Sequence, residues 1–553
     1  MIKQIRSTNN INADLHNNNS ANQNISLSAL PIDNGRPINL PSVPILAGVQ
    51  LFASEKFSQK IRRLTFLMLL VTLFAALVAL MGCSASQGVS ASNTPTQAAR
   101  TISVSPSTAS IQVWQSLQFS VSGDTSGASC TWQSTQPTVL TNLGSGQFQG
   151  GQPGTTQVSV TCGTMSATAS VVVSVQQPSG PVVITAGGTY SGNWNSTDPK
   201  VPAVTIKTDA PVTIQDSVIT SKGGLIDISG AKTGATVTIE NVTGTAVDPG
   251  IAGLQRGSFI NATNVTSLVV KQCTIKGASF GVKLAGASPT TLEISNNVAQ
   301  DLEDRASDGN GGLLTTRPRL GHFILLNSVS APSGAEIAWN QAVQTIGQTS
   351  TEDVVNISNS QGAVGHPIWV HDNYFEGASS PMTGSSHYTG TAMVTDGTGT
   401  GGSQPTANVL FDSNEVVATA GTGVGIAAGH DIQATKNRIV SCGVSSTGSW
   451  YAWGANAVVI WNYYKSTQFY NNTISGTIGG MVGPGTNNTP KAFDTWINAA
   501  DTNSPGSSIS SNDFTDPCLA GGAINLKAED AERAFWAAKV AGAAEPIGDQ
   551  HSN

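Results

Sequence analysis

The residues best suited to acid–base chemistry lie in the most charged part of the second half of the chain. His322 stands two residues before the apolar run that starts at Ile324, and Asp353 stands two residues before the run that starts at Val355. If these runs are adjacent stacked strands, the two side chains lie about 4.8 Å apart, close enough for a hydrogen bond. A carboxylate that fixes the imidazole tautomer and raises its basicity would make His322 a general base. Both residues also share the parity of core positions, so the alternative is a structural pair at the entrance of two strands.

Two arginines, Arg317 and Arg319, precede this histidine closely. A guanidinium can hold a carboxylate through two parallel hydrogen bonds, so both could recognise an acidic sugar, with Arg319 nearest the reaction. The outward positions of the strands that follow the long loops add Lys283 and Asn356 as further sugar contacts. The whole outward row is expected to be Asp227, Asn261, Lys283, Leu325, Asn356, Met393, Gly425 and Val459.

Glu352, Asp353 and Asn356 offer a second chemistry, because three oxygen donors fall in one short segment. Hard oxygen ligands suit calcium, so Glu352 and Asp353 form a candidate calcium site. The alternative is a pair of solvated turn carboxylates. The sequence holds no Cys–His metal motif and no phosphate-binding loop.

Aromatic residues gather near the end of the chain, although only 6% of all residues are aromatic. Flat rings beside a groove can stack on sugar faces. The alternative is that these rings cover the hydrophobic patch of their own loop. The candidate sugar contacts of this group are Trp450, Trp453, Trp461, Tyr463 and Tyr464.

A recurring phrase predicts the framework that positions these residues. From about residue 212 to 514, an apolar-x-apolar strand is followed by one or two polar residues, usually Asn, and a second strand. The repeat spacing, roughly 20 to 40 residues, indicates a solenoid with three strands per turn. Asn is expected at the bend because it tolerates a left-handed backbone. In register, the amides would form an internal ladder of Asn297, Asn373, Asn414, Asn437, Asn472 and Asn512.

These phrases resemble the right-handed parallel β-helices of the pectate-lyase-like superfamily over residues 177–525. The resemblance implies a polysaccharide groove and, for the lyases of this group, calcium-assisted β-elimination of uronates. Glu352-Asp353 and Gly365-His366 weakly resemble elements of the glycoside hydrolases of this fold, but the companion elements are missing. Residues 526–553 are expected to form a short helix and tail, with the helix covering an open end of the solenoid.

The N-terminal part carries the features of an exported protein. Residues 60–83 combine basic residues, an apolar run and Leu-Met-Gly-Cys83, and resemble a bacterial lipoprotein signal with Cys83 as the lipidated residue. The alternative is an uncleaved membrane anchor. Residues 1–59 are a leader of uncertain start that is expected to be disordered, and 84–99 form a flexible tether.

Residues 100–176 alternate apolar and polar side chains as short antiparallel strands do. Val104-Ser-Pro106, Cys130-Thr-Trp132-Gln-Ser and Gly154-Thr-Thr-Gln-Val158 resemble the bacterial group 2 Ig-like domain. In such an exported domain Cys130 and Cys162 can form a disulfide across the sandwich, or they remain two buried thiols. The pairing of Cys442 and Cys518 cannot be decided from their positions.

Composition favours strands and turns over helices, with 59 Gly and 11% charged residues. The net charge of −7 gives no support to a nucleic-acid partner. The sequence therefore predicts an all-β, monomeric, exported lipoprotein, anchored by its lipid, in the outer membrane or on the cell surface. Its β-helix is expected to act on an acidic polysaccharide, either by binding it or by cleaving it as a lyase. The alternatives are a non-catalytic adhesion or structural module and a glycoside hydrolase.

Overall fold

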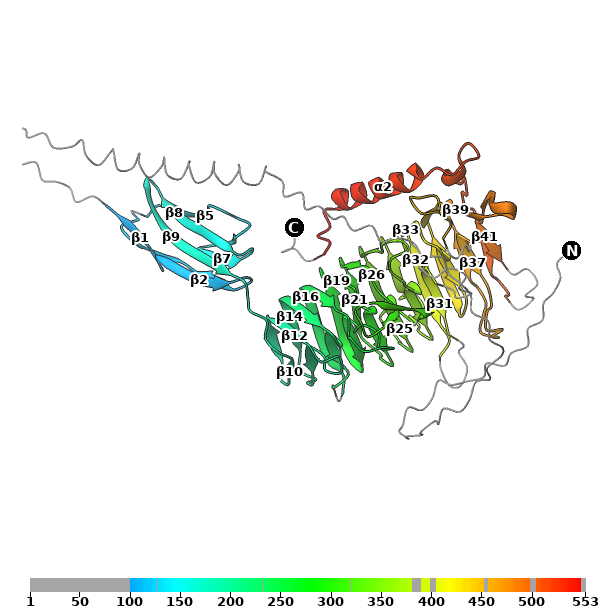
Figure 1. Cartoon of the computed structure of the whole chain (residues 1–553). Coiled ribbons are helices and arrows are strands. Elements are labelled where there is room, and N and C mark those ends of the chain that lie inside the picture. The colour runs from blue at the N-terminus through cyan, green and yellow to red at the C-terminus, as the bar shows by residue number, and fades with distance from the viewer. Residues whose placement is uncertain are drawn as a thin grey trace, which may run out of the picture. The chain divides into compact units, whose positions relative to one another are not determined.

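The structure is a computed structural model that describes residues 100–548 except 126, 232, 319, 380–388, 398–403, 452–455 and 498–503. The predicted leader, signal, tether and lipidated Cys83 lie outside the described residues, as do Arg319, Trp453 and the side chain of Arg317. Strands dominate what is described, so the chain is an all-β protein with one long helix in these ranges, α2 (Lys527–Ala543) (Figure 1). Within the same ranges, no helix is long and apolar enough to cross a bilayer.

The first nine strands form three small sheets, ordered β2-β9-β8-β5, β3-β7-β6 and β1-β4. Alternating side chains of these strands bury a separate core around Phe119 and Phe148. The strands are β1 (Ile102–Ser105), β2 (Thr108–Gln112), β3 (Ser116–Gln118), β4 (Ser120–Gly123), β5 (Cys130–Ser134), β6 (Leu140–Gly144), β7 (Gln147–Gly150), β8 (Gly154–Cys162) and β9 (Met165–Ser174).

Cys130 and Cys162 form a disulfide. They stand directly opposite each other on the paired strands β5 and β8, with their Cα atoms 4.2 Å apart. The bond therefore joins neighbours within one sheet, and the expectation that it crosses between two sheets is wrong.

An 11-stranded parallel sheet carries the predicted chemistry. Its short strands are rich in Val and Ile, which suit a pleated surface packed against a core. In order they are β10 (Val182–Ile184), β13 (Val204–Ile206), β15 (Ile226–Ile228), β17 (Ile260–Thr263), β20 (Phe280–Ala285), β25 (His322–Asn327), β28 (Asp353–Ser358), β31 (Thr391–Asp396), β34 (Val424–Ile426), β37 (Val458–Ile460) and β41 (Thr495–Ile497).

A 20-stranded sheet lies across the core from it, and its strands are parallel apart from the β39–β40 pair. They are β11 (Gly188–Tyr190), β12 (Asn193–Ser196), β14 (Val212–Ser221), β16 (Ala235–Ala246), β18 (Val265–Lys271), β19 (Thr274–Lys276), β21 (Thr291–Ser295), β22 (Val298–Gln300), β26 (Ala335–Ala338), β27 (Gln341–Val343), β29 (Ile368–His371), β30 (Tyr374–Glu376), β32 (Ala407–Asp412), β33 (Glu415–Val417), β35 (His430–Thr435), β36 (Arg438–Ser441), β38 (Thr473–Ser475), β39 (Ile478–Pro484), β40 (Pro490–Ala492) and β42 (Ser508–Ser510).

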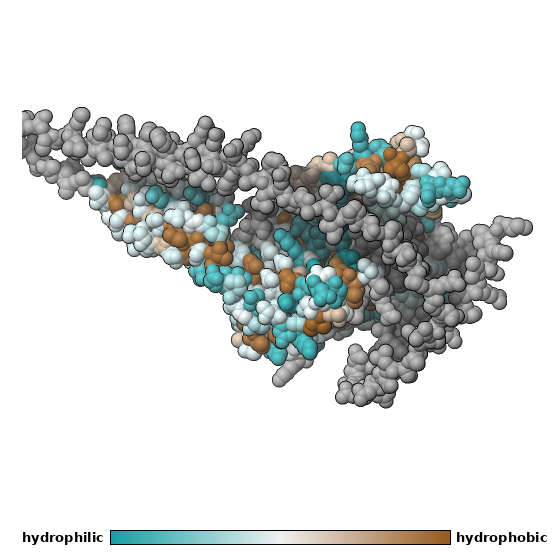
Figure 2. Space-filling model, viewed as in Figure 1, coloured by the Kyte–Doolittle hydropathy of each residue, from teal (hydrophilic) through white to brown (hydrophobic). Residues whose placement is uncertain are grey.

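The chain alternates between the two sheets, and one such passage is called a rung here. Each central rung contributes two strands to the 20-stranded sheet and one to the 11-stranded sheet, for example β21, β22 and then β25. The inward Val, Ile, Leu and Phe side chains of successive rungs form one continuous buried core. On the visible face, apolar side chains are scattered among polar ones (Figure 2). The three strands per rung agree with the repeat seen in the sequence.

The asparagine ladder runs through the bend between the paired strands. Asn297, Asn340, Asn373, Asn414 and Asn437 are buried, and each Oδ1 from Asn340 onward accepts the side-chain amide of the preceding member at 2.9–3.0 Å. The left-handed backbone belongs to the residue before each ladder Asn, namely Asn296, Trp339, Asp372, Ser413 and Lys436. The prediction that the ladder Asn itself makes the bend is therefore wrong.

Of the last two predicted ladder members, one is wrong and one is confirmed. Asn472 instead precedes β38 and accepts the backbone N–H of Ile432, because the bend of that rung falls at Thr477. Asn512 does lie in the column, where its Oδ1 accepts the N–H of Thr477 at 2.8 Å.

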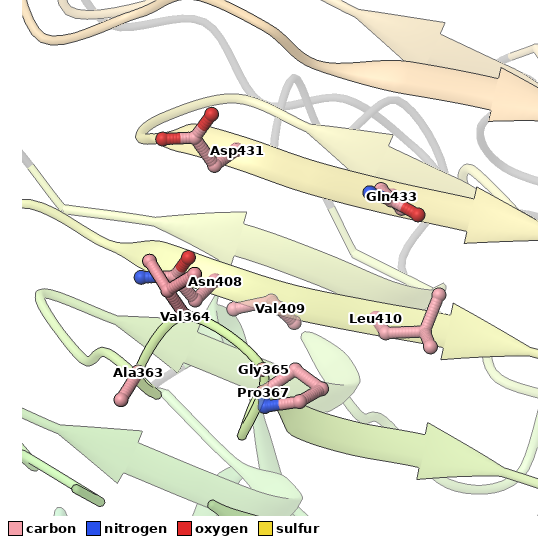
Figure 3. A pocket seen from close by; sticks show the side chains of 9 residues that line it. All are labelled: Ala363, Val364, Gly365, Pro367, Asn408, Val409, Leu410, Asp431 and Gln433. Atoms are coloured by element: carbon pink, nitrogen blue, oxygen red, sulfur yellow. The ribbon is translucent and has the colours of Figure 1, made fainter.

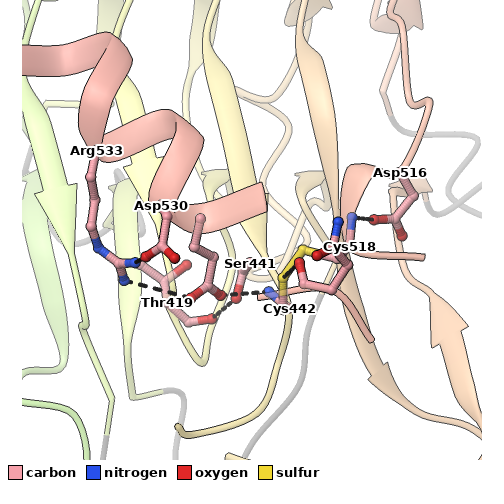
Figure 4. The surroundings of a disulfide bond; sticks show 9 residues. Thr419, Ser441, Cys442, Asp516, Cys518, Asp530 and Arg533 are labelled. Atoms are coloured by element: carbon pink, nitrogen blue, oxygen red, sulfur yellow. Dashed lines mark hydrogen bonds and ion pairs between the residues drawn. A yellow bond between two sulfur atoms is a disulfide. The ribbon is translucent and has the colours of Figure 1, made fainter. Parts of the chain in front are cut away.

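The C-terminal helix α2 packs along the bends of the 20-stranded sheet, so the predicted position over an open end is wrong (Figure 1). Trp536 is buried against Tyr374 with the ring centroids 5.4 Å apart. Arg438 and Glu532 form a bidentate ion pair at 2.6 and 2.8 Å. Just before the helix, the short 3-10 helix η2 (Pro517–Leu519) contains Cys518, which forms a disulfide with Cys442 (Figure 4).

Candidate functional site

His322 and Asp353 are register partners on the neighbouring strands β25 and β28, as the sequence predicts. The expected bond between the two side chains is replaced by a bond to the main chain. His322 Nδ1 lies 3.1 Å from the carbonyl oxygen of Asp353 and 3.8 Å from its Oδ2. That Oδ2 instead accepts the side-chain N–H of Asn356 at 2.9 Å. Because a carbonyl oxygen can only accept, Nδ1 carries the proton and Nε2 is left with its lone pair.

Glu352 faces that lone pair. Its Oε2 lies 3.6 Å from His322 Nε2, and its backbone N–H donates to the carbonyl of Gly321 at 3.1 Å. About 30% of its side chain is exposed, whereas that of His322 is 2% exposed. Glu352 is therefore the member of the group that solvent or a polymer can contact directly. His322 is too deeply buried for such contact, so the structure does not favour its predicted role as the base.

A third carboxylate, Asp304, completes the group, although no pattern in the sequence predicts it. Its backbone N–H donates to Ser350 at 2.8 Å, and its Cβ packs against Gly321, next to His322. The neighbouring Arg305 does not neutralise it, since that guanidinium makes a bidentate pair with Glu303 at 2.6 and 2.7 Å. The only sequence signal was that Asp304 belongs to the most charged stretch of the repeat region.

Burial dominates the electrostatics of this cluster, which we define as Asp304, His322, Glu352 and Asp353. It raises the pKa of Asp304 to about 7 and lowers the pKa of His322 to about 4, outweighing the hydrogen bond to Asp353. The predicted increase in the basicity of His322 is therefore wrong. Burial, followed for Glu352 by the charge of Asp353, also raises the pKa of Glu352 and Asp353 above their ordinary values. The imidazole is neutral at pH 7 and the carboxyl groups hold protons unusually tightly.

Lys283 and Asn356 lie in the predicted row, in register through Leu325 between them. The Lys283 ammonium lies 5.1 Å from the centroid of the Phe280 ring, which in turn packs 5.5 Å from the His322 ring. One member of the row is corrected. Val394 pairs with Asn356, whereas Met393 is buried in the core.

The predicted aromatic contacts separate into two groups. Trp461, Tyr463 and Tyr464 follow β37; Tyr463 is 45% exposed, and the Tyr464 hydroxyl donates to Asp396 at the end of β31. Trp450 instead packs on the small hydrophobic cluster around the disulfide of Cys442 and Cys518. For this residue the structure favours the alternative, in which the ring covers a hydrophobic patch and does not contact a sugar.

A depression of about 420 Å³ lies on the other sheet, lined by β32, β35 and the segment that precedes β29 (Figure 3). Gly365 lines it, whereas Glu352 precedes β28 of the 11-stranded sheet. The two elements that weakly resemble glycoside hydrolases are therefore not brought together. The lining residues are Ala363, Val364, Gly365, Pro367, Asn408, Val409, Leu410, Asp431 and Gln433.

In the structure, the predicted calcium ligands Glu352 and Asp353 lie together with a nitrogen donor, His322. Ligand atoms of His322, Glu352 and Asp353 all lie within 4.8 Å of one another. Calcium takes six to eight oxygen ligands, and an imidazole nitrogen is not among them. The group that converges here therefore fits calcium poorly.

No protein-family model matches the chain, and no curated protein matches its sequence.

Proposed function

We propose that the two large sheets form a right-handed parallel β-helix that binds an acidic polysaccharide and cleaves it by β-elimination. On this proposal residues 100–176 are an Ig-like spacer, and the protein is an exported monomer held at the outer membrane or cell surface through lipid on Cys83. One observation carries the catalytic part. The partly exposed Glu352 and the buried Asp353 form a proton-holding pair, and Asn356, which donates to Asp353, is in register with Lys283 through Leu325.

β-Elimination needs three functions around one uronate. Its carboxylate must be neutralised, a base must take the proton on the adjacent carbon, and an acid must protonate the leaving glycosidic oxygen as the carbon–oxygen bond breaks. Lys283 supplies the positive charge. Glu352 is the member of the pair that a polymer can contact, so its carboxylate takes this proton and then returns it to the leaving oxygen. The charge of Asp353 raises the pKa of Glu352 and so makes it a better proton acceptor, and the product carries a carbon–carbon double bond next to the carboxylate.

His322 acts through its neighbours in this scheme. Its neutral ring fixes the start of β28 by bonding the main chain of Asp353, and it fills the space behind Glu352. It is a positioning residue. Asn356 donates to Oδ2 of Asp353 and is itself buried, so it is a second positioning residue rather than a direct contact of the sugar.

The test is the ultraviolet absorbance of the unsaturated product, with the full chain mixed with pectic, alginate and glycosaminoglycan polymers. Lys283→Met should raise KM by about 10- to 100-fold, the effect of losing a hydrogen bond to a charged group. Lys271→Met is the matched control, because Lys271 pairs with Glu240 on the other sheet at 3.2 Å. An active protein whose KM does not change on Lys283→Met would contradict the role of this face.

A non-catalytic binding module is the second candidate, and the exposed ring of Tyr463 beside Tyr464 favours it. If so, polymers should slow the protein in affinity electrophoresis without any absorbing product. Tyr463→Ala should abolish that retardation, because an exposed ring contributes apolar stacking area. Retardation that survives this substitution would exclude the aromatic group as the binding surface.

A further inference from the structure

The cluster on β25 and β28 has the geometry of a metal centre. We infer that His322, Glu352 and Asp353 bind one divalent transition cation of the zinc and manganese class, with the amide of Asn356 beside Asp353 and the charge of Asp304 nearby. The inference rests on the proposed function only for the shared face: a bound cation adds positive charge beside the acidic sugar, but a carboxylate that binds it no longer holds a proton, so the metal-bound and proton-transferring states are alternatives. Binding of the metal can nevertheless be measured without any polymer.

The orientation of His322 is the first argument. A metal-binding histidine usually donates its second ring N–H to a carbonyl or carboxylate, which leaves the other nitrogen free for the metal. His322 does so through Nδ1 and the carbonyl of Asp353, and its Nε2 faces Oε2 of Glu352 at 3.6 Å. Two ligands about 2.0–2.1 Å from a tetrahedral zinc lie about 3.4 Å apart, so this separation already suits a shared cation.

Unpartnered buried oxygens are the second, independent argument. Asp304 is fully buried, and neither of its carboxylate oxygens makes a hydrogen bond; Ser350 is close enough to lower its pKa but not to bond in normal geometry. Oδ1 of the buried Asn356 and Oε2 of Glu352 also have no partner. Leaving such groups unsatisfied costs about 1–3 kcal/mol each, and more for charged groups. A cation beside Glu352 and Asn356 gives their free oxygens a partner, and it also offsets the negative charge of Asp304 nearby.

The charge around the cluster is the third argument. Other buried carboxylates of the described residues face a cation of the chain: Lys539 lies 3.6 Å from Glu415, and Arg305 lies 2.6 Å from Glu303. Asp304, Glu352 and Asp353 have no such ion pair with a lysine or arginine among the described residues. Lys283 is near enough to lower the pKa of His322, but it makes no ion pair with any of the three.

The nitrogen donor selects the class of metal. Imidazole together with carboxylates suits zinc, manganese and iron, whereas sites built for calcium or magnesium use oxygen alone. His322 is therefore the residue that distinguishes this inference from the calcium expectation. When bound, such a cation supplies Lewis-acid stabilisation of a neighbouring carboxylate.

The test uses the full chain, freed of metal with a chelator and then dialysed against Zn²⁺, Mn²⁺ or Ca²⁺ separately. Bound metal is counted by mass spectrometry, and affinity is measured by titration calorimetry. We expect one Zn²⁺ or Mn²⁺ per chain. Glu352→Gln and His322→Gln should each weaken binding at least 10-fold, because even second-shell changes cost about 10- to 100-fold.

Glu336→Gln is the matched control. Glu336 also lies beside a histidine, with 3.4 Å between Oε1 and Nε2 of His371, but there Lys539 supplies the positive charge at Asp372. The affinity of the Glu336→Gln variant for the metal should equal that of the parent protein. Glu352 is partly exposed, so Glu352→Gln should keep the fold even if His322→Gln does not, and circular dichroism checks both.

Several results would overturn the inference: no stoichiometric Zn²⁺ or Mn²⁺ in the parent, unchanged affinity in folded Glu352→Gln, or binding of Ca²⁺ in preference to both. The two proposals fail separately. Metal binding that depends on Glu352 without any unsaturated product would reject the lyase and keep the metal site. Cleavage that survives complete removal of metal, in a protein that binds no stoichiometric metal, would reject the metal site and keep the lyase.

Discussion

Removing one central member of the asparagine ladder should destabilise the protein far more than removing an asparagine from the outward row. Asn373 accepts the backbone N–H and the side-chain N–H of Asn340, each at 2.9 Å. Its own amide donates to the carbonyls of Ile337 and His371 and to Oδ1 of Asn414. All three asparagines are fully buried, so water cannot replace these bonds without entering the core.

Asn373→Ala leaves two buried donors of Asn340 without an acceptor, at about 1–3 kcal/mol each. The three acceptors that lose a donor keep other partners in the sheet, so we expect a total loss of about 4 kcal/mol. Asn261→Ala is the control, because Asn261 is only partly buried and makes one side-chain bond, to Asp227 at 2.9 Å. Its cost should be about 1 kcal/mol.

Urea unfolding followed by tryptophan fluorescence measures both variants, with the shift of the midpoint multiplied by the slope of the parent protein. The slope must be the same in the three proteins for the comparison to hold. A loss below about 1 kcal/mol for Asn373→Ala, or one equal to that of Asn261→Ala, would refute the view that the ladder is a cooperative buried network.

Three further outcomes follow from the C-terminal region. Trp536→Ala should cost about 3–5 kcal/mol through loss of a buried ring and should make the C-terminal helix sensitive to limited proteolysis; a protease-resistant variant would contradict its role as the anchor. Replacing Cys518 with Ser opens a loop of 76 residues to Cys442, and chain entropy predicts a loss of about 4 kcal/mol in the same urea assay, whereas an unchanged midpoint would show that packing alone holds this segment. Burial and the nearby Asp516 raise the pKa of Asp494 to about 6, so its protonated form is favoured on folding and this stabilisation is lost as the pH rises from about 4 through 6. Because the side chain is half exposed, Asp494→Asn should stabilise the protein by only about 1 kcal/mol at pH 8 and not at pH 4; equal effects at both pH values would contradict the sign.

The repeat itself could be predicted because a two-residue periodicity and a recurring bend are local patterns. The bend was assigned one residue too late, however, since Trp339 and Lys436 adopt the left-handed conformation that was expected of the asparagines that follow them. Only the stacking of rungs decides this, because the ladder amide must point inward to reach its neighbours. The same stacking includes Asn340, which follows a tryptophan, and excludes Asn472, which precedes β38.

The part of the candidate site that depends on strand register could be predicted from the sequence. Counting from the apolar pairs was enough to align His322 with Asp353, since register in a parallel sheet follows from which residues face the core. Whether His322 would be a base or a buried support depended on the residues packed around its ring. The imidazole is buried beside Phe280, Glu352 and Asp353, and this three-dimensional packing has no periodic signal in the sequence.

The sequence by itself therefore determined the strand repeat, the all-β class and the row that carries Lys283 and Asn356. Each of these rests on neighbours in the chain or on a fixed spacing between rungs. The tertiary structure alone decided the protonation of the cluster, the partner of Cys442 and the position of α2. These depend on burial and on contacts between segments far apart in the chain, which no local pattern of residues encodes.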